Sequence, residues 1–119
     1  MVPAAKIAVS RSDLVASLSF GCAEEAWFWT MGALRNRRDG ARRNHASIPR
    51  PCEPDDVIRC LDRLYQQRQI TLTHARVLRT WGERQLAPDL RQPDSPDTRL
   101  WLEAMARLAP ALRHKGIIA

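Results

Sequence analysis

The sequence predicts an all-α protein, a small bundle of four to five helices that contains a helix-turn-helix-like pair. Three observations favour this class. Apolar residues recur at intervals of three and four in several segments, helix-start and helix-end residues flank those segments, and no segment is convincing as a strand. With 119 residues, of which 45% are hydrophobic, the chain is expected to form one domain with a modest core.

The N-terminal part begins with a stretch that has no usable periodicity. Residues 1–9 are small and apolar, and we expect them to form a flexible tail before a single helical domain at 10–119. Ser10 or Ser12 suits the N-cap of a short helix, which is expected to stop near Gly21.

A stronger helix is predicted from 23 to 38, with acidic residues in its first turn, arginines in its last turn and Gly40 as a left-handed terminator. It contains three consecutive aromatic residues, Trp27, Phe28 and Trp29. Successive helical residues point about 100° apart, so the three rings cannot all face one neighbour. Either this helix is central and packs on two sides, or one ring is exposed at an interface with a protein partner or a second copy.

The segment from Arg35 to Arg50 holds six arginines against one aspartate, and we predict a basic loop at about 39–52. It has no apolar periodicity, so we expect it to be mobile. A flexible arginine arm can follow phosphates or enter a minor groove of DNA. The alternative interpretation is a solvated charged loop.

The central helix pair lies between residues 53 and 87. Pro54 suits a first helical position, and Thr71 suits the N-cap of the second helix after a turn of about four residues. We expect the apolar stripes of the two helices to face each other, with Ile70 and Leu72 in the angle between them. The stripe of the first helix is Val57, Ile58, Leu61, Leu64 and Tyr65.

The second helix of the pair has two distinct sides at 100° per residue. The predicted inner side carries His74, Val77, Leu78, Trp81 and Gln85. A hydrogen-bonded core histidine is the simpler interpretation of His74. The predicted outer side is mostly cationic and carries Thr73, Arg76, Arg79, Thr80, Glu83 and Arg84.

A proline-rich connector at about 88–96 separates the pair from a last helix. Ser95 is expected to cap that helix, and Pro96 suits its first position. Pro110 is expected to kink or end it, although the apolar spacing continues, and 113–116 resembles a helix end. Across the chain, the residues expected to be buried are Leu61, Leu64, Leu78, Trp81, Leu100, Trp101 and Leu108.

Catalytic, metal and cofactor chemistry has no support in the pattern. The three cysteines and three histidines fall in no metal-ligand spacing. The odd number of cysteines and the long separations between them favour reduced thiols over disulfides. No nucleophile elbow or glycine-rich phosphate loop occurs, so no cofactor and no enzymatic activity are expected. The absence of a long apolar run predicts a cytoplasmic protein with no membrane partner.

The formal charge of +6 favours an anionic partner, and DNA binding, with a regulatory role, is the leading interpretation. In this reading Thr73, Arg76, Arg79, Thr80 and Arg84 face the groove of the DNA. Arg37, Arg38, Arg42 and Arg43 hold its phosphates. The alternative is a protein-interaction module that docks on a partner through the aromatic ridge at Trp27, Phe28 and Trp29.

Overall fold

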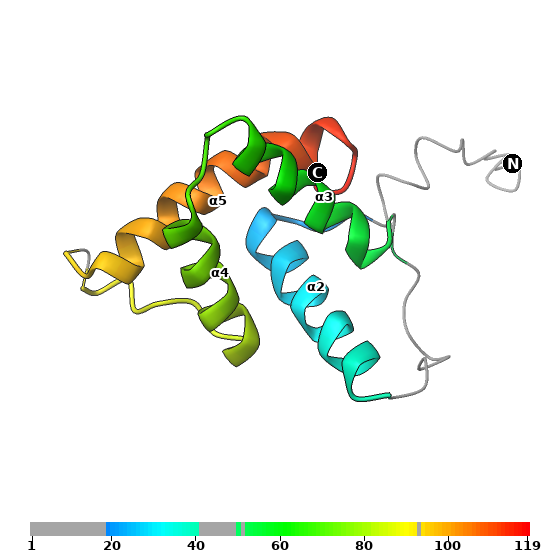
Figure 1. Cartoon of the computed structure of the whole chain (residues 1–119), viewed down its shortest axis with the longest axis horizontal. Helices are drawn as coiled ribbons and strands as arrows, with labels where there is room; N and C mark the ends of the chain where they lie inside the picture. Colours follow the sequence, from blue (N-terminus) through cyan, green and yellow to red (C-terminus); the bar gives the residue numbers. More distant parts are fainter. Residues whose placement is uncertain (1–18, 41–49, 51, 93) are drawn as a thin grey trace, which may run out of the picture.

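Four α-helices and no strand are present in the residues that the computed structural model describes, which are 19–40, 50, 52–92 and 94–119 (Figure 1). The helices are α2 (Ala23–Arg38), α3 (Pro54–Gln66), α4 (Leu72–Arg84) and α5 (Pro96–His114). The all-α prediction is confirmed. The predicted tail, nearly all of the predicted N-terminal helix and most of the basic loop, with Arg42 and Arg43, lie outside the described residues.

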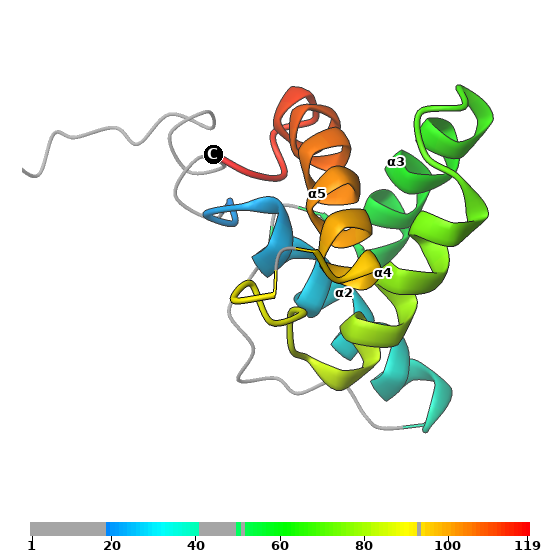
Figure 2. The ribbon, with the colours of Figure 1, turned by 90° about the vertical axis from the view of Figure 1, so that its left-hand side faces the viewer.

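Helices α2 and α5 each pack against all the other helices, whereas α3 and α4 make few contacts with each other. Figure 2 shows α3 and α4 on the same side of α5. The prediction that the stripes of α3 and α4 face each other is therefore wrong. Leu78 shows the reason, because its carbonyl accepts a hydrogen bond of 2.9 Å from Nε1 of Trp27, which holds α4 against α2.

The three consecutive aromatic residues of α2 all pack against other parts of this chain. Trp27 is 2% exposed, whereas Phe28 and Trp29 are half-buried. The Phe28 ring stacks on Trp101 of α5 with its centroid 5.7 Å away, and the Trp29 ring lies 5.1 Å from that of Phe20. Such pairs stabilise by about 0.5 to 1.5 kcal/mol beyond the burial of their area. Helix α2 is thus a central helix that packs on several sides.

The turn after α3 reverses the chain without a glycine. Arg68 takes the left-handed conformation, with φ of 61°, and Gln69 donates its N–H to the Leu64 carbonyl at 2.9 Å. A left-handed residue other than glycine costs about 1 kcal/mol. Two contacts offset this cost, since Ile70 is only 2% exposed and the Arg107 side chain donates to the Gln69 carbonyl. Leu72, also expected in this angle, is 61% exposed.

The start of α4 is capped as predicted. Thr71 Oγ1 accepts the His74 N–H at 3.4 Å, and the His74 Nδ1 accepts the Thr71 N–H at 3.0 Å. Because Nδ1 is an acceptor, the ring proton of the neutral imidazole lies on Nε2, which is 3.3 Å from Oε1 of Glu103. His74 is buried and hydrogen-bonded, as expected for a core histidine.

Helix α5 ends within 113–116 as predicted, with Gly116 in the left-handed conformation, but it differs from the prediction at its start and at Pro110. Ser95 stands at the N-cap position, but its hydroxyl makes no capping bond. The helix runs through Pro110 to His114, so Pro110 does not end it. Leu108 and Leu112 on either side of the proline are fully buried, and their packing outweighs the single backbone bond that proline removes.

The core extends beyond the predicted residues. Four of the seven predicted residues are buried, while Leu61, Trp81 and Leu100 are only half-buried. The chain after α5 returns to the short segment before α2. There Phe20 donates its N–H to the Ile117 carbonyl at 3.0 Å, and the Phe20 carbonyl accepts the Ala119 N–H at 2.9 Å. The buried residues that were not on the predicted list include Phe20, Ala26, Trp27, Val57, Ile70, Leu112, Ile117 and Ile118.

Candidate nucleic-acid interface

The solvent-facing side of α4 carries the residues that the periodicity placed there. We call this set the α4 cationic face, and its members are Thr73, Arg76, Arg79, Thr80, Glu83 and Arg84. Each of them is exposed or half-buried, while His74, Val77 and Leu78 on the other side are buried. The predicted orientation of α4 is therefore confirmed for these residues.

The charges of the α4 cationic face are unequally engaged. Arg79 lies 3.4 Å from the carboxylate of Glu83, and Arg84 lies over the Trp81 ring at 4.9 Å from its centroid. Arg76 is exposed and makes no hydrogen bond or ion pair with any described residue. Three guanidinium groups and one carboxylate leave the face with a net positive charge, and Arg76 has its charge fully available to a ligand.

A side chain links the last turn of α2 to the last turn of α4: Arg35 donates a hydrogen bond to the Glu83 carbonyl. Figure 1 shows these two helix ends at the same end of the molecule. The predicted phosphate ligands near this end already have carboxylate neighbours, Asp55 at 3.2 Å from Arg37 and Asp39 at 3.7 Å from Arg38. Exposed ion pairs of this kind stabilise by at most about 1 kcal/mol.

Arg35 was not among the predicted site residues. Its signal in the sequence was its place in the last turn of a helix, where a positive charge interacts favourably with the helix dipole whether or not a ligand is present. The sequence does not predict that α4 lies within reach of the Arg35 side chain.

The aromatic ridge predicted as a docking surface is occupied within the chain. Trp27 is buried and hydrogen-bonded to α4, while Phe28 and Trp29 each have a ring partner. The structure therefore brings these residues into the core and its margin, and not into one exposed patch.

The three cysteines differ in exposure and in acidity. Cys22 is exposed, Cys52 is half-buried and Cys60 is buried. Burial raises the pKa of the Cys52 thiol to about 11, with smaller contributions from Asp56 and Cys60. Burial also raises the pKa of Cys60, against the opposing effect of Lys115 and Arg63. Nowhere among the described residues do three or more His, Cys, Asp or Glu side chains gather as a metal ion requires.

These differences predict the reactivity of the thiols. At pH 8, folded protein should react quickly with Ellman's reagent through Cys22 alone, because a raised pKa leaves little thiolate at Cys52 and Cys60 and burial shields them. All three thiols should react in urea. Cys22→Ser should remove the fast phase, and a second fast thiol in that variant would contradict the prediction.

None of the helices in the described part of the chain combines the length and the apolar character that crossing a bilayer requires. Comparisons with models of protein families, with curated proteins and with solved structures find no match to this chain.

Proposed function

We propose that the protein binds DNA, with the α4 cationic face against the major groove and the arginines at the end of α2 on flanking phosphates. One observation carries this proposal. Arg76 is exposed on the solvent-facing side of α4, makes no ion pair with a described residue, and is flanked by further arginines and threonines.

The chemistry of these residue types supports the proposal. The major groove of B-DNA admits one α-helix, and arginine is the residue that most often binds guanine there, through two parallel hydrogen bonds. Threonine hydroxyls donate to phosphates or base edges. Because the inner side of α4 is packed against α2 and α5, only the α4 cationic face is free to enter a groove.

Glu83 is the one carboxylate on this face, and a carboxylate beside phosphate costs free energy. Arg79 lies 3.4 Å from this carboxylate and partly offsets its charge. In the proposed complex Arg79 therefore serves mainly to screen Glu83, and Arg76 makes the stronger contact with DNA.

The ion pairs of Arg37 and Arg38 do not prevent phosphate binding. Both arginines and their carboxylate neighbours are more than half exposed. A pair that contributes at most about 1 kcal/mol gives way to a phosphate, whose binding also releases counterions from the DNA. Docking of a partner on the aromatic ridge is not carried forward, because those rings pack against this chain.

The test is an electrophoretic mobility shift with mixed genomic fragments over a salt series. Arg76→Ala should weaken binding to the fragments that wild type shifts first by about tenfold, because it removes the contact of Arg76 with a base edge in the groove. Arg113→Ala is the matched control. It removes the same charge from the far end of α5, where Arg113 donates to the Ala119 carbonyl, and it should bind like wild type.

Two results contradict the proposal. One is the absence of any complex at moderate salt. The other is equal affinity of the Arg76→Ala and Arg113→Ala variants, which would attribute binding to net charge alone and not to the α4 cationic face.

A further inference from the structure

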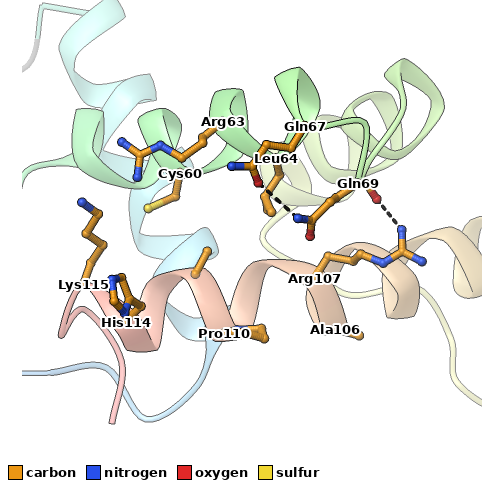
Figure 3. Close-up of a pocket in the computed structure, with 11 residues that line it drawn as sticks. Cys60, Arg63, Leu64, Gln67, Gln69, Ala106, Arg107, Pro110, His114 and Lys115 are labelled. Carbon is orange, nitrogen blue, oxygen red and sulfur yellow. Dashed lines mark hydrogen bonds between the residues drawn. The ribbon is translucent and has the colours of Figure 1, made fainter.

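A groove runs between the C-terminal halves of α3 and α5 (Figure 3), and none of the residues that line it belongs to the α4 cationic face. Its volume is about 420 Å³, within the range of sites that hold small organic ligands. The groove exists because α5 presents short side chains here, Ala106, Pro110 and Ala111, opposite Cys60 and Leu64 of α3. These side chains give it an apolar floor.

The rim of the groove carries two cationic side chains and a histidine. Arg63 comes from α3 and His114 and Lys115 from the end of α5, and Figure 3 shows all three around the end of the groove where Cys60 lies. Both Arg63 and Lys115 line the groove, and both lower the pKa of the Cys60 thiol against the larger effect of burial, so each charge lies on the Cys60 side of the groove.

No carboxylate opposes these charges inside the groove. The residues that line it include neither Asp nor Glu. Asp56, which also acts on the Cys60 thiol, is engaged by Arg59 at 2.9 Å and by the Glu53 N–H at 2.9 Å. Among the described residues, the side chains of Arg63, His114 and Lys115 have no hydrogen-bond or ion-pair partner.

The carbonyls at the end of α5, beside the groove, are occupied by backbone hydrogen bonds. The last carbonyls of α5 accept the N–H groups of Lys115, Gly116 and Ile117 at 3.3, 3.0 and 2.9 Å. These carbonyls are therefore occupied and compete little for the Lys115 ammonium group. Positive side chains that converge without a counter-charge repel one another, and an anion between them removes that repulsion.

We propose that this groove binds a small phosphate monoester whose phosphate lies between Arg63 and Lys115 and whose apolar part rests on Leu64 and Pro110. Two cationic groups from different helices match the double charge of a phosphate monoester, and guanidinium binds phosphate oxygens in pairs. The apolar floor requires that the phosphate be attached to an organic group. This inference is independent of DNA binding.

The test is a titration of the full chain with phenyl phosphate, without DNA, followed by amide chemical shifts in two-dimensional NMR. We expect shifts confined to 60–69 and 106–115. Inorganic phosphate should bind at least tenfold more weakly because it leaves the apolar floor uncovered, and benzyl alcohol should not bind. Benzoate, with one charge, should bind more weakly than phenyl phosphate.

Three variants separate the two parts of the proposed site. Arg63→Gln combined with Lys115→Gln should weaken phenyl phosphate at least tenfold. Ala106→Leu fills the floor while it keeps the charges, so it should weaken phenyl phosphate but leave inorganic phosphate unchanged. Arg91→Gln removes one positive charge from the connector before α5, away from the groove, and it should bind like wild type.

The proposal is overturned if phenyl phosphate shifts no amide of the groove, or if the double variant binds it as wild type does. Equal binding of benzoate and phenyl phosphate, or of inorganic phosphate and phenyl phosphate, would also overturn the assigned ligand class. Thermal unfolding followed by circular dichroism shows whether each variant is folded. If the double variant is unfolded, the comparison of Ala106→Leu with wild type still tests the proposal.

Discussion

Replacing Leu78 with alanine should lower the free energy of unfolding by about 2 to 5 kcal/mol, as expected for removing a fully buried leucine from a packed core. Leu78 is 0% exposed and stands where α4 meets α2, beside the Trp27 ring that is bonded to its carbonyl. Alanine leaves a cavity there that the rigid indole cannot fill. Urea unfolding followed by circular dichroism measures the loss.

Leu61→Ala is the matched control for Leu78→Ala. It removes the same atoms from α3, but Leu61 is only half-buried, so its loss should be less than half as large. If the two variants unfold at the same urea concentration, Leu78 is not more deeply buried than Leu61. That result would also contradict the packing of α4 on α2.

Gly82→Ala should destabilise the protein by about 3 kcal/mol, even though alanine favours a helix over glycine by about 1 kcal/mol. A Cβ at Gly82 would lie 2.7 Å from Nε1 of Trp27 and 2.7 Å from Cγ of Met31. Met31 can turn aside, but the buried Trp27 ring cannot move without losing its hydrogen bond to Leu78. Thermal and urea unfolding both report this change.

Gly32→Ala gives the opposite expectation on the facing helix. The nearest atom to a Cβ there is Nε2 of Gln85 at 3.8 Å, an ordinary contact. Only the helix propensity then changes, so the variant should be more stable by up to about 1 kcal/mol. Equal stability of the Gly32→Ala and Gly82→Ala variants would mean that α2 and α4 do not approach closely at Gly82.

The helices themselves were predictable from local patterns. The bounds of α2 and α4 depend on residues within a few positions of each end, such as Gly40 after α2 and Thr71 before α4, and these signals act within one turn. A stripe of apolar residues shows which side of a helix is buried, but it does not name the helix that covers it. Leu61 is an example. It belongs to the apolar stripe of α3, as predicted, but α3 packs against α2 and α5 and makes few contacts with α4.

The same limit separates the two cationic surfaces. The α4 cationic face belongs to one helix, so its periodicity alone predicted it. The groove depends on how α3 and α5 cross, and each of its charges had a sufficient local explanation. Lys115, for example, follows a helix end, where a positive charge is favourable without any ligand. Only the folded chain brings Arg63 and Lys115 together.

The return of the chain from α5 to Phe20 also bears on when the protein can fold during its synthesis. Ser19 Oγ bonds the carbonyl of Gly116, 97 residues later, and Ile117 and Ile118 complete the core around Phe20. A ribosome that has made only α2 to α4 therefore carries a chain whose Phe28 ring still lacks its partner, Trp101 of α5, and whose Phe20 lacks Ile117 and Ile118. The core around Phe20 can close only after residue 118 has emerged, and apolar surface that is exposed until then favours aggregation.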